Sequence, residues 1–247
     1  METWRLVETA AAPGDWNMAV DAALLESVAA HGVPCLRFYA WSVPTVSLGY
    51  FQNYKDRESH VASLSCPIVR RSTGGGAIVH DREVTYSLVI PAEHSRAAHP
   101  PDLYQLVHRA LVEALAEWQL TATICPGAEK RPPADEPFLC FQRRSCGDVL
   151  LGAAKIAGSA QRRRRGAILQ HGSVLFEKSA AAPELFGISE VGGRTLPMGD
   201  VARAWRERLG KTWGVCWHPR GLDAVEEQRA AAIVQQTYGQ SDWTQRR

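Results

Sequence analysis

The chain has 247 residues, of which 45% are hydrophobic and 22% are charged, and its formal net charge at pH 7 is +2. These values are typical of a soluble globular protein with one sizeable core, and the small net charge argues against a dedicated nucleic-acid binder. No window approaches the roughly 18 apolar residues that a membrane helix needs.

The N-terminal residues and the cysteines indicate the cellular compartment. No apolar stretch follows Arg5, so a secretory signal is not expected. Six cysteines are scattered along the chain without a CxxC pair. In a chain of this length, that pattern predicts reduced thiols, no metal site and a cytoplasmic protein.

The first third of the chain predicts one helix followed by short strands. Residues 15–31 carry apolar side chains at helical spacing, with Asp15 or Asn17 as the expected cap. Residues 34–41 and 44–51 are expected to be strands. The segment 66–80 predicts a strand, a glycine turn and a second strand, and 83–91 predicts a further strand that ends at Pro91.

The rest of the chain alternates between helices and strands. Residues 101–120 form the clearest predicted helix, capped by Asp102, and the proline-rich segment 126–137 predicts a loop. Three strand-like runs follow at 147–152, 154–161 and 166–177. From Leu196 onward the chain is predicted to be mainly helical, at 196–213 and 222–239. This order predicts an α/β or α+β fold, with a mixed β-sheet core, flanking helices and a helical C-terminal region.

The stretch RRSTGGGAIVHD, residues 70–81, contains three consecutive glycines. It is not a Walker loop, because no Lys-Ser or Lys-Thr follows the glycines and the chain continues as a strand. It also fails the GxGxxG pattern, since Ile78 and Val79 occupy the later positions. Consecutive glycines let a ligand lie directly against the backbone, and a tight hairpin turn is the alternative.

A second cluster, residues 150–176, contains a lysine and several small residues. Lys155 lies in an apolar run, where it is either a solvated edge lysine or a functional one. The small residues of Gly158-Ser159-Ala160 and His171-Gly172-Ser173 suit the wall of a ligand pocket. The run Arg162 to Arg165 predicts a solvated turn or, alternatively, a contact face for an acidic partner.

A third cluster, FLCFQRRSC at residues 138–146, contains Cys140. A single cysteine is usually a small buried hydrophobic residue. A reactive cysteine needs a nearby cation that favours its thiolate, and Arg143, Arg144 and Lys155 are the candidates.

In this order, the three clusters resemble the lipoate-protein ligase A/octanoyltransferase family of the biotin/lipoate protein ligase superfamily. RRSTGGGAIVHD is similar to its RRxTGGGxVxHD signature, and KIAGSAQRRRRGAILQHGSVL is similar to its KxxGSAQxR and QHGxxL segment. The resemblance covers nearly the whole chain. It implies a single catalytic domain of that family over residues 1–247.

Within the family, Cys140 resembles the nucleophile of the LipM-type octanoyltransferases, in which a Cys-Phe pair precedes the GSAQ lysine by fifteen positions. Cys140-Phe141 and Lys155 keep this spacing. Cys146, beside two arginines, is a rival, and Cys216 is the cysteine downstream of the lysine. ATP-dependent ligases need no such cysteine and usually carry an accessory domain, for which this chain ends too soon.

The resemblance implies that an octanoyl group moves from octanoyl-acyl carrier protein to a lysine of a lipoyl domain or glycine cleavage H protein. Cys140 is the implied nucleophile that forms an acyl thioester, and Lys155 is the implied contact of the acyl carbonyl. No cofactor is implied. The implied substrate-binding residues are Arg71, Gly74, Gly75, Gly76, His80, Gly158, Ser159, Ala160, His171 and Gly172.

Other functions stay open at this point. One is an ATP-dependent lipoate-protein ligase, which requires ATP and Mg²⁺, and another is an amidotransferase that moves octanoyl or lipoyl groups between carrier proteins. A third is an inactive homologue that binds carrier proteins. Nucleic-acid binding through the arginine run is disfavoured, because no aromatic residues alternate with the arginines.

Overall fold

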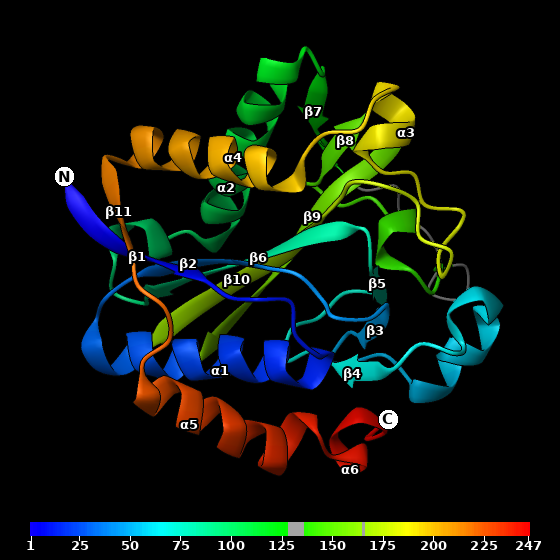
Figure 1. The fold of residues 1–247 in the computed structure, drawn as a ribbon, viewed down its shortest axis with the longest axis horizontal. Coiled ribbons are helices and arrows are strands. Elements are labelled where there is room, and N and C mark those ends of the chain that lie inside the picture. The colour runs from blue at the N-terminus through cyan, green and yellow to red at the C-terminus, as the bar shows by residue number, and fades with distance from the viewer. Residues whose placement is uncertain (128–135, 165) are drawn as a thin grey trace.

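The computed structural model describes residues 1–127, 136–164 and 166–247. Its centre is a mixed eight-stranded sheet with helices on both faces, which confirms the predicted fold class (Figure 1). The strand order is β11-β1-β2-β6-β10-β9-β8-β7. The strands are β1 (Glu2–Glu8), β2 (Cys35–Tyr39), β6 (Glu83–Pro91), β7 (Ala122–Ile124), β8 (Val149–Leu151), β9 (Ala154–Arg164), β10 (Ala167–Leu175) and β11 (Val215–Pro219).

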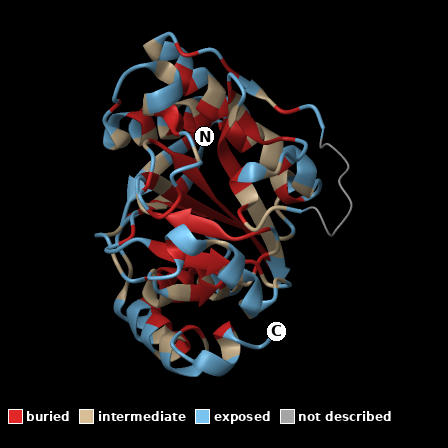
Figure 2. Cartoon of the chain, turned by 90° about the vertical axis from the view of Figure 1, so that its right-hand side faces the viewer, coloured by how far each residue is buried: buried red, intermediate tan, exposed pale blue. Residues whose placement is uncertain are grey.

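Helices cover both faces of this sheet. Helices α2 (Pro100–Leu115) and α4 (Met198–Trp213) pack on one face, α1 (Gly14–His31) packs on the other, and α5 (Ala224–Ile233) packs on the outer side of α1 (Figure 1). Two short helices, α3 (Ile188–Gly192) and α6 (Ser241–Thr244), lie at the periphery. Because both faces are covered, β10 is buried along its whole length, and the buried residues gather in the central strands (Figure 2).

Alternating residues of the central strands belong to two different cores. Leu88 and Ile90 of β6 pack in the core under α2 and α4, whereas Val89 packs in the core under α1. On β10, Ile168 belongs to the first core and Leu169 to the second. This period of two is the pattern that an extended strand imposes on a sheet with two buried faces.

A small three-stranded sheet carries the glycine segment. Its strands are β3 (Thr45–Leu48), β4 (Ile68–Arg70) and β5 (Ile78–His80), in the order β4-β3-β5. The two predicted strands on either side of the glycines are therefore confirmed. The tight-hairpin interpretation is wrong, because β3 lies between β4 and β5 and the glycines connect two strands that do not pair.

Several local predictions differ from the structure. Pro13 is the N-cap of α1, whereas Asp15 lies in its first turn and the buried Asn17 donates to the Ala12 and Ala40 carbonyl oxygens. Helix α2 begins at Pro100, which places Asp102 in its first turn rather than at the cap.

The C-terminal region also contributes to the sheet, because β11 pairs in parallel with β1 at one edge. Arg162 to Arg164 continue strand β9, so the predicted turn is wrong for these three residues. Arg165 and residues 128–135 of the predicted loop lie outside the described residues. Among the described helices, none is long and apolar enough to span a membrane.

Candidate active site

The glycine segment is held in place by a buried arginine. Arg71 Nη1 donates to the Ser47 carbonyl oxygen at 2.6 Å, and Nη2 donates to the carbonyl oxygens of Gly74 and Gly76 at 3.0 and 2.9 Å. Burial lowers the pKa of Arg71 to about 10, so the guanidinium stays charged at neutral pH. Arg71 therefore fastens the loop while its side chain also lines the adjacent cavity.

Gly75 is the point where this loop meets Cys140. Its φ of +91° lies in the left-handed region that favours glycine, and a Cβ there would lie 3.7 Å from Cys140 Sγ. The loop is close to Cys140 because the Cys140 N–H donates to the Ala77 carbonyl oxygen at 2.7 Å. The predicted close approach of a ligand to bare backbone is thus available next to the sulfur.

Cys140 begins a single turn of 3₁₀-helix, Cys140–Gln142, and is half-buried. The next residue, Phe141, packs in a small cluster with Ile78 and Leu175, which anchors the turn on β5 and β10. The rival cysteines lie elsewhere. Cys146 is exposed and lines neither of the two cavities that meet at Cys140, and Cys216 is exposed on the edge strand β11.

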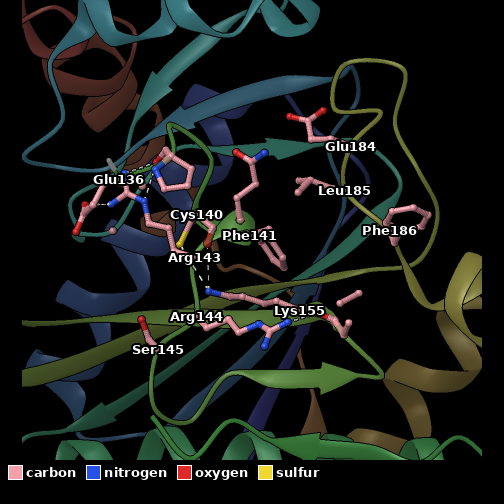
Figure 3. Close-up of a pocket in the computed structure, with 16 residues that line it drawn as sticks. Glu136, Cys140, Phe141, Arg143, Arg144, Ser145, Lys155, Glu184, Leu185 and Phe186 are labelled. Atoms are coloured by element: carbon pink, nitrogen blue, oxygen red, sulfur yellow. Dashed lines mark hydrogen bonds and ion pairs between the residues drawn. The ribbon is translucent and has the colours of Figure 1, made fainter. Parts of the chain in front are cut away.

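Lys155 on β9 points toward Cys140 (Figure 3). Its Nζ lies 3.9 Å from Cys140 Sγ and 3.4 Å from the Cys140 carbonyl oxygen. The edge-lysine interpretation is wrong, because β9 lies between β10 and β8 and the Lys155 side chain is only 3% exposed. Arg143 and Arg144 line the same cavity, but Arg143 pairs with Glu136 and Arg144 donates to the Ala153 carbonyl oxygen.

Asp148 is the partner of Lys155, and the sequence analysis did not single it out. Its Oδ2 lies 2.8 Å from Lys155 Nζ and accepts from the Ser145 N–H at 2.6 Å, while its Oδ1 accepts from the Tyr104 hydroxyl at 2.8 Å. A buried ammonium requires such a counter-charge. This requirement could have identified Asp148 from the sequence, because a lysine in an apolar run predicts a nearby carboxylate and Asp148 lies just before strand β8.

Ser159 belongs to a second buried network beside this ion pair. His108 Nδ1 donates to the Gly147 carbonyl oxygen at 2.7 Å, and burial lowers the pKa of His108 to about 4. The neutral Nε2 therefore accepts from the Ser159 hydroxyl, 2.7 Å away. Tyr86 donates to the same hydroxyl oxygen at 2.7 Å. The Ser159 hydroxyl is fully engaged within the protein, which favours a structural role in the pocket wall.

Two cavities meet at Cys140, Gly75 and Phe141. One is an open cavity of about 580 Å³ that contains Lys155 and the arginines named above (Figure 3). The other, called here the tunnel, is narrow, with a volume of about 40 Å³, and is lined by the glycine loop, β5, β9 and β10. Nine of the ten predicted substrate-binding residues line the tunnel: Arg71, Gly74, Gly75, His80, Gly158, Ser159, Ala160, His171 and Gly172. Gly76 lines the open cavity. Ser173, predicted to suit a pocket wall, also lines the tunnel, and the tunnel residues that the sequence analysis missed are Met18, Tyr39, Ile78, Thr85 and Phe141.

The two tunnel histidines have partners within the protein. His80 stacks on Trp41 with 3.9 Å between ring centroids, and its ring nitrogens contact Ser47 and Glu83 at 2.7 and 3.1 Å. His171 contacts Thr73 at 2.7 Å and Asp21 at 3.2 Å. Burial lowers the pKa of His80. Because these nitrogens are satisfied, the tunnel wall requires no hydrogen bond from an occupant and suits an apolar chain.

Close packing at Gly172 yields a stability prediction. A Cβ on Gly172 would lie 2.2 Å from Ser159 Oγ and 2.4 Å from the Gly158 carbonyl oxygen. Gly172→Ala is expected to lower the free energy of unfolding by about 2 kcal/mol, because β9 and β10 must move apart. Urea unfolding measures this change. Gly199→Ala is the control, since a Cβ at that helical position has nothing within 4 Å. An unchanged unfolding midpoint for Gly172→Ala would contradict the packing.

Known proteins were compared with this chain. Residues 13–203 match the family described as the lipoyl protein ligase A/B catalytic domain. The octanoyltransferase LipM of Symbiobacterium thermophilum is 33% identical, with 100% of both chains covered. That of Moorella thermoacetica is 34% identical, with 100% of this chain and 99% of the relative covered.

Solved structures share the fold. A lipoate-protein ligase A bound with ATP superposes with a TM-score of 0.78 at 22% identity, covering 99% of both chains. A bi-partite lipoate protein ligase from Thermoplasma acidophilum has a TM-score of 0.79 at 20% identity, covering 99% of this chain and 97% of that one. The full-length similarity to the LipM proteins separates this chain from the ligases that share its fold. The chain belongs to the lipoyl protein ligase A/B family and, within it, to the octanoyltransferases of the LipM type.

Proposed function

We propose that this enzyme transfers an octanoyl group from octanoyl-acyl carrier protein to a lysine of a lipoyl domain or glycine cleavage H protein, in lipoate biosynthesis. The observation that carries the proposal is the position of Cys140 Sγ, at the junction of a narrow tunnel and an open cavity and 3.9 Å from Lys155 Nζ. A thioester substrate fits this arrangement. Its apolar acyl chain matches the tunnel, its polar carrier arm matches the open cavity, and its sulfur lies between the two.

In the first step, the acyl chain enters the tunnel, which must widen beyond its volume of about 40 Å³ to hold the whole chain, and the Cys140 thiolate attacks the thioester carbonyl carbon. The Lys155 ammonium lies where it favours the thiolate and donates to the developing oxyanion. When the tetrahedral intermediate collapses, the bond between the carbonyl carbon and the sulfur of the carrier arm breaks. The arm leaves as a thiol after taking up a proton, and Cys140 keeps the octanoyl group.

In the second step, the neutral amine of the acceptor lysine enters through the open cavity and attacks the acyl-Cys140 thioester. A carbon–nitrogen bond forms, the bond to Cys140 Sγ breaks, and the amine loses one proton. The first step exchanges one thioester for another and is nearly isoenergetic, whereas conversion of a thioester to an amide is downhill. The proposed reaction therefore uses neither ATP nor Mg²⁺.

Asp148 contributes by holding Lys155 in place. With its carboxylate 2.8 Å from Nζ, Asp148 keeps the Lys155 side chain aimed at Cys140. The hydrogen bonds from Ser145 and Tyr104 hold the carboxylate in turn. Lys155 thus serves as a fixed positive charge, and because its side chain is only 3% exposed, that charge has a larger effect than it would in solvent.

Intact-protein mass measurement tests the proposal. The protein is incubated with octanoyl-acyl carrier protein without ATP, and the expected result is one octanoyl adduct, which disappears when apo H protein is added. A parallel incubation with octanoylated H protein as donor tests the amidotransferase alternative. A third incubation, with octanoate, ATP and Mg²⁺, tests the ligase alternative. Modification of H protein in the third incubation alone, with no adduct in the first, would refute the proposed function.

A further inference from the structure

A basic and aromatic patch lies beside the glycine loop and has no role in the chemistry described above. It consists of Tyr50, Phe51, Arg162, Arg246 and Arg247 and is called here the arginine patch. The guanidiniums of Arg162 and Arg246 lie 5.2 and 4.2 Å from the centre of the Tyr50 ring, and that of Arg247 lies 5.4 Å from the Phe51 ring. Strand β9 and the segment 241–247, far apart in sequence, thus present their cations together.

The patch is fastened to the body of the protein by Arg70. Its Nε donates to the Thr244 carbonyl oxygen at 3.0 Å, and its Nη1 donates to the carbonyl oxygens of Gly49 and Gln52 at 2.9 and 2.7 Å. The Tyr54 N–H donates to a main-chain carboxylate oxygen of Arg247 at 2.7 Å. The arginine patch is therefore a preorganised surface, which loses little conformational entropy when a partner binds.

The patch borders the active-site loop. The Phe51 side chain, 65% exposed, lies 4.0 Å from the position that a Cβ on Gly74 would occupy. The next residue, Gly75, is the glycine that faces Cys140 Sγ. A protein bound on the patch is thus beside the mouth of the tunnel, with its centre displaced from Cys140 itself.

The charge of the patch is only partly balanced, because three guanidiniums face a single carboxylate within it, the main-chain carboxylate of Arg247. In residues 1–127, 136–164 and 166–247, none of the arginine side-chain ion pairs includes Arg162, Arg246 or Arg247. This differs from Arg203 and Arg208 on α4, which pair with Asp200 and Glu117. With a net charge of only +2 for the whole chain, three unpaired arginines on one rim are a local concentration of positive charge that attracts an acidic surface.

We infer that the arginine patch docks the donor, through an acidic face around the attachment point of its thioester arm. This inference rests on the proposed function. The lengths of the two arms favour the donor over the acceptor, because a phosphopantetheine arm is about three times as long as a lysine side chain. The short lysine requires the acceptor to sit directly over the open cavity at Cys140. The longer arm allows the donor to bind a surface that lies to one side of Cys140, and the arginine patch is such a surface.

The test compares two donors that share the same thioester. The triple variant R162Q/R246Q/R247Q is expected to raise KM for octanoyl-acyl carrier protein about tenfold with little change in kcat, because electrostatic attraction increases the encounter rate. The rate with octanoyl-pantetheine, which carries no protein, is expected to remain at the wild-type value. Raising the ionic strength should increase the KM of the wild-type protein for octanoyl-acyl carrier protein more than that of the variant, because salt screens the attraction. The corresponding triple lysine variant should restore most of the loss.

A control removes the same number of charges elsewhere. R194Q/R203Q/R208Q alters exposed or half-exposed arginines at and before α4, on the opposite side of the main sheet (Figure 1), and should leave both donors unaffected. A KM for octanoyl-acyl carrier protein within twofold of wild type in the glutamine variant would overturn the inference. An equal loss with octanoyl-pantetheine would also overturn it, since the patch would then act on the active-site loop.

One further measurement separates donor from acceptor. Acyl-enzyme prepared with octanoyl-pantetheine is mixed with apo H protein, and the glutamine variant is expected to transfer at the wild-type rate. A slower transfer with normal loading from the carrier would show that the patch binds the acceptor and would overturn the inference. If the wild-type protein forms no acyl-enzyme from either donor, the proposed function itself has failed, and this result differs from all of the preceding ones.

Discussion

Cys140→Ser is expected to lower octanoyl transfer by at least about a thousandfold and to abolish thioester formation. A serine hydroxyl is much less acidic than a thiol, and Lys155 alone, 3.9 Å away, does not deprotonate it. The measurement is intact mass after incubation with octanoyl-acyl carrier protein, together with the rate of H protein modification. The protein fold should be retained, because the substitution changes only one half-buried atom.

Cys146→Ser is the matched control for this experiment. Cys146 lies in the same segment, six residues further along the chain, but it is exposed and lines neither cavity. Its variant is expected to load and transfer octanoyl at the wild-type rate. Adduct formation on Cys140→Ser that disappears in Cys146→Ser would reverse the assignment of the nucleophile.

Lys155→Met is expected to reduce the rate of acyl-enzyme formation about a hundredfold, the effect of losing one donor to an oxyanion in a buried site. Methionine keeps a comparable apolar stem but removes the charge near Cys140 Sγ. Stopped reactions with octanoyl-pantetheine, followed by mass measurement, give this rate without any contribution from carrier docking. A wild-type acylation rate in Lys155→Met would eliminate the role assigned to the lysine.

Asp148→Asn tests whether the carboxylate acts through Lys155. It is expected to reduce acylation about tenfold, because the ammonium loses the partner that holds it at 2.8 Å. The rate of Cys140 alkylation by iodoacetamide, measured against pH, should be lower in Asp148→Asn than in the wild-type protein and lower still in Lys155→Met. If the double variant is ten times slower than Lys155→Met alone, the carboxylate has a role that does not depend on the lysine.

Much of the fold could be predicted because its local signals are strong. Strand β6 was predicted with the bounds that the structure shows, and α1 and α4 were predicted to within two residues at either end. Strands β1 and β7 were not predicted, because β7 is an edge strand of only three residues and β1 pairs with β2 and β11, which are distant in sequence. The arginine run was predicted as a turn because consecutive charged residues are typical of exposed turns. In the structure, Arg162 to Arg164 belong to strand β9 and pair with residues 167–169 of β10.

For the candidate site, the motifs predicted which segments line the two cavities and that Cys140 and Lys155 lie together. This was possible because a motif consists of the residue types that the chemistry needs at a fixed spacing, and both can be read directly from the sequence. The burial of Lys155, its contact with Asp148 and the position of β3 between the two strands beside the glycines could not be predicted from the motifs. Those facts depend on contacts between residues far apart in the chain, whose burial and charge pairing arise only when the strands assemble into sheets.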